Sequence, residues 1–268
     1  MPFFAQERYY CGPAALAMVL AWSGLSVTQE DLVSQVYTPG MQGTLRSDIL
    51  AAARRHGRLT LRIESLSNLL AEIAAGHPVL VFQNLGLDWY PQWHFAVAIG
   101  YDLEAHEVVL RSGRNSRQIT PLVTFERTWT RGDSWAVVVL PPDKLPVRAS
   151  EMAVLRATVA LERAERHVDA ATAYSAILRR WPNSFAALMG LGNVHYAVGD
   201  LGSAEAAFRR AIARHPQMPD AWNNLAYVLA ERGHRFEAGK AAQEAIRLAG
   251  ANADAYRATL REISHSQN

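Results

Sequence analysis

A 34-residue period in the second half of the chain constrains the fold most. Pro182 and Pro216 lie 34 residues apart, and alanines recur with the same spacing at Ala170, Ala204 and Ala238. A period of this length is typical of a unit of two helices, and each such unit exposes an apolar face until a neighbouring unit covers it. The sequence therefore predicts a stack of about three helix pairs with an atypical cap at the end.

Other positions keep the same period when the repeats are counted from residues 151, 185 and 219. Four and seven residues after the recurring alanine stand Tyr174 and Ile177, Phe208 and Ala211, and Ala242 and Ala245. The first-helix positions hold Leu188, Leu191, Gly192 and His195 in the middle repeat, and Trp222, Leu225, Ala226 and Leu229 in the third. The first repeat fits only in its second helix, and residues 254–263 are predicted to form the cap. The alternative is an unrelated alanine-rich helical bundle.

Residues 150 to 265 resemble the tetratricopeptide repeat family on these spacings. The resemblance implies an all-α solenoid that binds a protein partner. Three prolines between residues 141 and 146 exclude a continuing helix or central strand just before it. We therefore predict a first domain over residues 1–140, a proline-rich linker at 141–149, and repeats with a capping helix over 150–268.

The first domain has a mixed pattern. Helices are predicted over residues 12–22, from about residue 28, over 47–56 and over 67–75, on their apolar periodicity and on start and stop residues such as Thr28 with Asp31 and Gly57. Strands are predicted at residues 79–82, 95–100, 107–110 and 135–140, which are rich in β-branched and aromatic residues. The pattern indicates an α+β domain in which N-terminal helices pack on an antiparallel sheet.

Charge and composition exclude several classes of protein. Lys plus Arg total 27 against 25 Asp plus Glu, so there is no electrostatic footprint for nucleic acid. The longest apolar run, residues 14–22, is shorter than the roughly 20 residues of a membrane span. A single cysteine rules out an intramolecular disulfide and a cysteine-based zinc site, and we expect no metal and no cofactor. The N-terminus lacks a signal-like segment, as in a cytoplasmic protein or in a chain whose targeting segment has been removed.

The only cysteine, Cys11, stands at the start of an apolar helix. Free backbone N–H groups and the positive end of the helix dipole favour a thiolate there, so we expect a low thiol pKa and a nucleophile. Gly12 would let the backbone approach a bound carbonyl, and Pro13 fits the first turn of a helix. A small buried hydrophobe is the alternative role of a lone cysteine.

A thiol nucleophile needs a base, and the first domain contains four histidines. His56, His77 and His106 lie at a helix end or in turns, where solvated or capping roles explain them. His94 begins a predicted strand, which is a rigid mounting for a general base. Gln6, five residues before Cys11, carries a side-chain amide that could join the Cys11 backbone N–H in holding an oxyanion.

The run Cys-Gly-Pro-Ala-Ala-Leu from residue 11, the glutamine before it, and the run His-Phe-Ala-Val-Ala-Ile-Gly-Tyr-Asp from residue 94 resemble the bacteriocin-processing, double-glycine peptidases and their stand-alone relatives. The likeness covers about residues 3–140 and implies a papain-like fold with Cys11 as nucleophile, His94 as base and Gln6 as oxyanion donor. It also implies a bacterial protein of the periplasm or envelope. The cysteine motif of true papains is absent.

One position departs from that family. An Asp usually ends the strand after the histidine strand, whereas here the strand ends in Arg111-Ser112-Gly113. Ser112 falls nearest to the expected place, Asn115 lies further out, and Asp102 is explained as a turn residue. We therefore expect a neutral group, such as the Ser112 hydroxyl, a backbone carbonyl or water, to orient His94.

Three functions remain open on the sequence. The first is a cysteine peptidase that cleaves a peptide or protein through a thioester, with the repeats recruiting the substrate or a partner. The missing Asp favours a second reading, a peptide-binding module with weak or no catalysis. The third is an acyl transferase or amidase that uses the same Cys-His pair.

Overall fold

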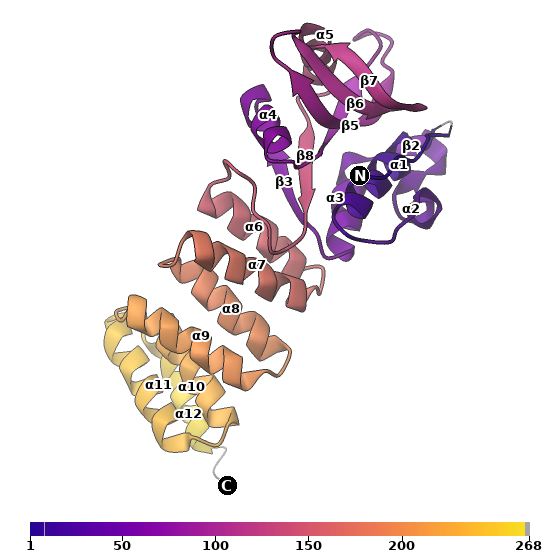
Figure 1. The fold of residues 1–268 in the computed structure, drawn as a ribbon. Helices are drawn as coiled ribbons and strands as arrows, with labels where there is room; N and C mark the ends of the chain where they lie inside the picture. The colour runs from indigo at the N-terminus through magenta and orange to yellow at the C-terminus, as the bar shows by residue number, and fades with distance from the viewer. Residues whose placement is uncertain (8, 266–268) are drawn as a thin grey trace. The chain divides into compact units, whose positions relative to one another are not determined.

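The computed structural model describes residues 1–7 and 9–265 and divides the chain into two compact units, Met1–Arg166 and His167–Asn268. Figure 1 shows an α/β unit followed along the chain by a unit built of helices, which confirms the predicted fold class. Helix α6 (Glu151–Glu162) packs on strand β3 (Leu59–Ile63) and belongs to the first unit. The domain limits predicted at residues 140 and 150 stay predictions.

Five helices of the first unit precede α6. They are α1 (Cys11–Trp22), α2 (Gln29–Val36), α3 (Arg46–Arg55), α4 (Leu66–Ala74) and α5 (Leu122–Thr130), with a 3-10 turn η1 (Pro39–Met41) between α2 and α3. The Thr28 hydroxyl accepts from the Asp31 backbone N–H and the Asp31 carboxylate accepts from the Thr28 N–H. This capping box confirms the predicted start of α2.

A six-stranded antiparallel sheet forms the body of the first unit. Its strand order is β3, β8, β4, β5, β6, β7, so β3 and β7 are the edges. The strands after β3 are β4 (Val79–Asn84), β5 (Trp93–Asp102), β6 (Glu107–Ser112), β7 (Asn115–Pro121) and β8 (Ala136–Leu140). A separate two-stranded sheet pairs β1 (Tyr37–Thr38) with β2 (Gly43–Thr44).

Helix α1 and helix α5 cover opposite faces of that sheet. Leu80 of β4 belongs to the apolar core around α1, whereas Gln83 of the same strand donates to the Thr128 hydroxyl of α5. Alternate strand residues point to opposite faces, so the odd separation of these two residues places the helices on either side. Nine consecutive residues of α1, from Gly12 to Leu20, are buried, which fixes its first residue firmly against the sheet.

The strands around residues 79–82, 95–100, 107–110 and 136–140 are present as predicted. Strands β3 and β7 and helix α5 were not predicted. Edge strand β7 reads Asn-Ser-Arg-Gln-Ile-Thr-Pro and is mostly exposed, so its sequence has little of the apolar alternation that indicates a strand.

The second unit consists of helices in pairs. They are α7 (His167–Arg180), α8 (Phe185–Ala197), α9 (Leu201–Arg214), α10 (Pro219–Glu231), α11 (Arg235–Ala249) and α12 (Asp254–His265), with the 3-10 turn η2 (Gly250–Asn252) before α12. Close packing explains the glycines of α8: a Cβ on Gly190 would lie 2.3 Å from the Tyr174 ring, and one on Gly192 would lie 2.4 Å from the Phe208 ring. Across the described residues, none of the helices has the length and apolarity of a membrane span.

Candidate active site

Cys11 is the first residue of α1 and lines a cavity of about 810 Å³. His94 and Gln6 line the same cavity, so the structure brings together the three residues singled out in the sequence. Their elements are far apart in the chain: the N-terminal segment, the start of α1 and the start of β5. No hydrogen bond between the Cys11 sulfur and the His94 ring occurs in the described part of the chain.

Burial of Cys11 changes the expected chemistry of its thiol. Loss of solvent raises the pKa of Cys11, and the backbone N–H groups of Phe95, Gly12 and Cys11 itself, which point at the sulfur, lower it by less. The expectation of a low thiol pKa is therefore wrong for this structure. The helix N-terminus does supply donors, but desolvation of a thiolate outweighs them.

His94 lies at the start of β5, opposite Gln83 of β4. Its Nε2 lies 2.9 Å from the Ser112 hydroxyl at the end of β6, which is the neutral contact expected from the sequence. Burial lowers the pKa of His94 to about 4, so the ring is neutral at neutral pH. Cys11 and His94 thus rest as an uncharged thiol and an uncharged imidazole.

Gln6 is buried and held by the sheet at three points. Its backbone N–H donates to the Gly113 carbonyl at 3.0 Å, and its side-chain Oε1 accepts from the Gly113 N–H at 3.0 Å. Its Nε2 donates to the Phe95 carbonyl at 3.3 Å. Phe95 follows His94 directly and directs its N–H to the Cys11 sulfur, so one residue of β5 links Gln6 to Cys11.

Gly12 has a structural role that sequence reasoning did not assign. A Cβ on Gly12 would lie 2.3 Å from Oγ1 of Thr44, the last residue of β2. The glycine therefore lets β2 approach α1 beside Cys11. The Thr44 hydroxyl oxygen is buried and makes no hydrogen bond to the residues that the structure covers.

Apolar and charged residues that the sequence analysis missed form the walls of the cavity. The Phe82 and Trp93 rings stack with centroids 5.2 Å apart, and Trp93 is 52% exposed. The Arg46 guanidinium lies 5.3 Å from the Phe82 ring centroid and pairs with Asp133 at 2.9 Å. Trp93 could have been found because it precedes His94. Arg46 and Asp133 carry no local signal, since only the fold brings them to the cavity.

The other first-domain histidines lie elsewhere. His56 caps the end of α3, in line with its predicted role. The Nδ1 of His77 lies 2.7 Å from the buried Glu72 carboxylate, so a solvated role was the wrong prediction for it. Asp102 accepts from the N–H groups of Glu104 and Ala105, which confirms its turn role.

Comparisons with known proteins match the two parts of the chain to two different families. The model of the Peptidase_C39 like family matches residues 1–135, and a tetratricopeptide repeat model matches residues 155–203 and 189–262. None of the curated proteins matches the chain.

Among solved structures, a C39-like peptidase from Bacillus anthracis is 21% identical over 52% of this chain and 94% of its own, with a TM-score of 0.43. The Sgt2 tetratricopeptide repeat domain from Aspergillus fumigatus is 18% identical over 43% of this chain and 78% of its own, with a TM-score of 0.41. The first such domain of Spaghetti, bound to an HSP90 peptide, is 15% identical over 43% of this chain and 91% of its own, also with a TM-score of 0.41. A family match over half of the sequence identifies the chain as a member of the Peptidase_C39 like family, in which tetratricopeptide repeats follow the peptidase-like domain.

Proposed function

We propose that the protein is a cysteine peptidase that cleaves a peptide bond through a thioester on Cys11, with His94 as general base and acid and Gln6 as oxyanion donor. The position of the His94 ring is the observation that most supports this proposal. Its Nε2 is occupied by Ser112 while the ring lines the same cavity as Cys11, so Nδ1 is left for the nucleophile. A base whose tautomer is held by a second group is the recurring arrangement in nucleophilic catalysis.

Catalysis starts from neutral partners under this proposal. The Cys11 sulfur attacks the substrate carbonyl carbon while His94 Nδ1 takes the thiol proton, so charge develops only as the carbon–sulfur bond forms. A neutral imidazole with a pKa of about 4 is available as a base throughout the neutral range. The Gln6 amide and the Cys11 backbone N–H stabilise the negative charge that grows on the carbonyl oxygen.

The reaction is completed by transfer of the same proton. The tetrahedral intermediate collapses, the carbon–nitrogen bond breaks, and the His94 imidazolium gives its proton to the leaving amine. Water then attacks the thioester while His94 takes a proton from it. The acid product leaves and the Cys11 thiol is restored.

The walls of the cavity favour a peptide with a large apolar side chain near the bond that is cut. Trp93 and the Phe82 ring beneath it offer a flat aromatic surface. Met41 and Leu45 of the segment opposite are 62% and 42% exposed at the same cavity. Apolar surface of this kind binds extended segments by excluding water from both partners.

The repeats supply the protein-binding part of the proposal. A cavity of about 300 Å³ in the second unit is lined by Asn193, Tyr196, Phe208, Asn224 and Tyr227. The Asn224 side chain donates to the Asn193 side chain at 3.0 Å, and both amides keep further donors and acceptors for a peptide backbone. We place the binding of a substrate or adaptor protein on this surface.

The decisive experiment digests a peptide library with the full chain and identifies new termini by mass spectrometry. The wild type should produce cleavage sites that Cys11→Ala does not, and Cys11 should be trapped as a thioester that hydroxylamine releases. Adding an amine acceptor separates hydrolysis from acyl transfer. A library left intact by the wild type, with Cys11 inert to a peptide aldehyde, contradicts the proposal.

The second candidate is a module that binds a peptide without cutting it. Two observations favour it: the raised pKa of Cys11 and the neutral Ser112 in the place of a carboxylate. A peptide that binds the wild type and Cys11→Ala equally, with no product, is the result expected of this candidate.

A further inference from the structure

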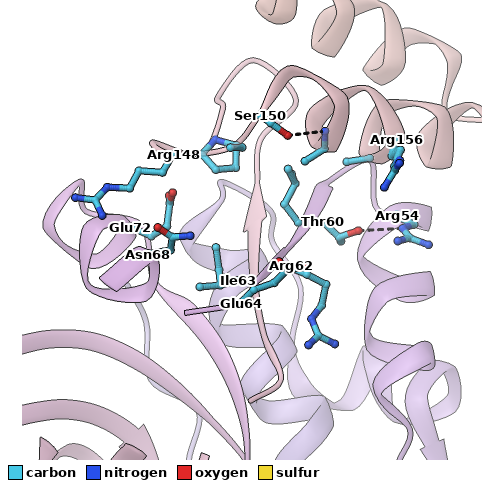
Figure 2. A pocket seen from close by; sticks show the side chains of 15 residues that line it. Arg54, Thr60, Arg62, Ile63, Glu64, Asn68, Glu72, Arg148, Ser150 and Arg156 are labelled. Atoms are coloured by element: carbon cyan, nitrogen blue, oxygen red, sulfur yellow. Dashed lines mark hydrogen bonds between the residues drawn. The ribbon is translucent and has the colours of Figure 1, made fainter. Parts of the chain in front are cut away.

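A second cavity of the first unit, of about 450 Å³, lies along the free edge of strand β3 (Figure 2). Its other walls come from α3, α4 and residues 146–157, which include the start of α6. Buried Leu61, Ile63 and Ala157 give it an apolar floor. It shares no lining residue with the cavity around Cys11.

Four arginines line this cavity. Figure 2 shows Arg54 and Arg156 at the end where Thr60 lies, whereas the side chains of Arg62 and Arg148 point away from these two. None of the four forms an ion pair with a carboxylate in the part of the chain that the structure describes. Arg54 and Arg156 come from two elements, α3 and α6, so a single ligand group could be held from both sides.

The carboxylates of the cavity do not balance these charges. Glu72 is buried and already accepts from the Val147 backbone N–H at 2.7 Å and contacts the His77 ring at 2.7 Å. Glu64 is exposed and acts on Arg62 from a distance. Among the lining residues, one free carboxylate, that of Glu64, is set against four guanidinium groups, and Asp133 from outside the lining also acts on Arg62. The lining therefore carries an excess of positive charge.

Arg54 is a partly buried cation that has no carboxylate partner among the described residues. It is half-buried, its Nε donates to the Thr60 hydroxyl at 2.9 Å, and burial lowers its pKa. A partly desolvated cation without an anion is unfavourable, because hydration is lost and no opposite charge replaces it. Arg62 is positioned by its guanidinium lying 5.4 Å from the Trp135 ring centroid.

We propose that this cavity binds a small organic anion, whose carboxylate or phosphate group is held by Arg54 and Arg156 and whose carbon body covers the apolar floor. Guanidinium groups match such oxyanions with paired N–H donors. The volume is in the range of small-molecule sites, which lie between roughly 300 and 1,000 Å³. The site does not depend on the proposed peptidase activity, because it contains none of the residues assigned to that activity.

The test measures the thermal midpoint and the binding isotherm of the full chain with phenyl phosphate, phthalate and inorganic phosphate, each against potassium chloride of equal ionic strength. An organic anion at about one hundred times its Kd should raise the thermal midpoint of the first unit by about 5 °C, as expected for a ligand that binds the native state alone. The two organic probes identify which acid is preferred. Inorganic phosphate, which lacks the carbon body, should bind more weakly.

Arg54→Gln combined with Arg156→Gln should weaken binding by about tenfold or more, since two charge-assisted contacts are lost. Arg156→Glu, on the exposed surface of α6, gives a second test if the double variant folds poorly. Arg117→Gln, an exposed arginine of β7 far along the sheet, is the matched control and should bind as the wild type does. Equal binding by all variants, or shifts no larger than those with chloride, would overturn the proposal.

Discussion

The candidate active-site cleft, which is the cavity around Cys11, and the repeats are built by opposite means. In the cleft, contacts join residues that are distant in the chain, such as Gln6 with Phe95 and Gln6 with Gly113. In the repeats, each helix packs on the next, and the contacts of Gly190 and Gly192 reach only one helix back or forward. The cleft therefore depends on the whole first unit, whereas the repeats depend on neighbours alone.

The two regions also differ in the environment of their ionisable side chains. The cleft partly buries a thiol and an imidazole and keeps both neutral by desolvation. In the repeats the carboxylates have partners: the buried Glu205 pairs with Arg209 and Arg232, and hydrogen bonds from Ser203 and Arg247 lower the pKa values of Asp200 and Glu244. A thiol and an imidazole that line one cavity can serve acid–base chemistry, so that chemistry is expected in the first region.

The largest effect is expected on peptide cleavage, when the Cys11 thiol is removed from the first region. Cys11→Ala should lower peptide cleavage by at least about a thousandfold, because the thioester can no longer form. Arg210→Ala, an exposed arginine of α9, should leave cleavage of the same peptide unchanged. Steady-state rates on one short peptide make the comparison, and an activity that survives Cys11→Ala would place the chemistry elsewhere.

Acid should weaken the first unit through His94. The unfolded chain binds the His94 proton near pH 6.5, whereas the folded chain binds it only near pH 4. The contribution of the neutral ring is therefore present above pH 6.5 and is lost as the pH falls to about 4, by up to about 3 kcal/mol. Denaturant unfolding of the wild type and His94→Gln at both pH values measures it. An equal pH dependence in the two proteins would contradict the desolvation of the ring.

A smaller effect concerns packing between the repeats. Gly192→Ala should lower the free energy of unfolding of the second unit by about 2 kcal/mol, because the new Cβ would overlap the Phe208 ring. Gly239→Ala on α11 is the matched control: nothing lies within 4 Å of its new Cβ, so it should stabilise the helix by up to about 1 kcal/mol. Thermal unfolding followed by circular dichroism checks both signs. Similar effects of the two substitutions would show that the close approach of α8 and α9 is not needed.

The smallest effect is expected at Ser112. Ser112→Ala removes one hydrogen bond to His94, worth about 1 kcal/mol, and should slow turnover by about fivefold. Ser112→Asp should raise the pKa of His94 and could speed the reaction by stabilising the imidazolium. The pH profile of kcat/KM separates this positioning role from a loss of folding. A Ser112→Ala loss as large as that of Cys11→Ala would rule out a merely supporting role.

Much of the fold could be predicted because its signals are local. The Thr28–Asp31 capping box and the apolar α1 were recognisable in the sequence, and the repeats followed from a spacing of 34 residues. Strand β7 and helix α5 were not recognised, since β7 is exposed and α5 begins directly after it at Leu122. Their structure depends on pairing with β6 and packing on the sheet, which a short window of sequence does not report.

The sequence by itself determined the family, the helix pairs and the candidate residues Cys11, His94, Gln6 and Ser112, because residue types and spacings carry that information. The tertiary structure decided their electrostatics. A helix N-terminus predicts a thiolate, yet the folded sheet removes water from Cys11 and His94 and leaves both neutral. The tertiary structure also forms the arginine-lined cavity beside β3, whose lining residues are up to about one hundred residues apart in the sequence. Desolvation and charge clustering depend on everything that surrounds a group in space, and neither is written in the residues beside it in the chain.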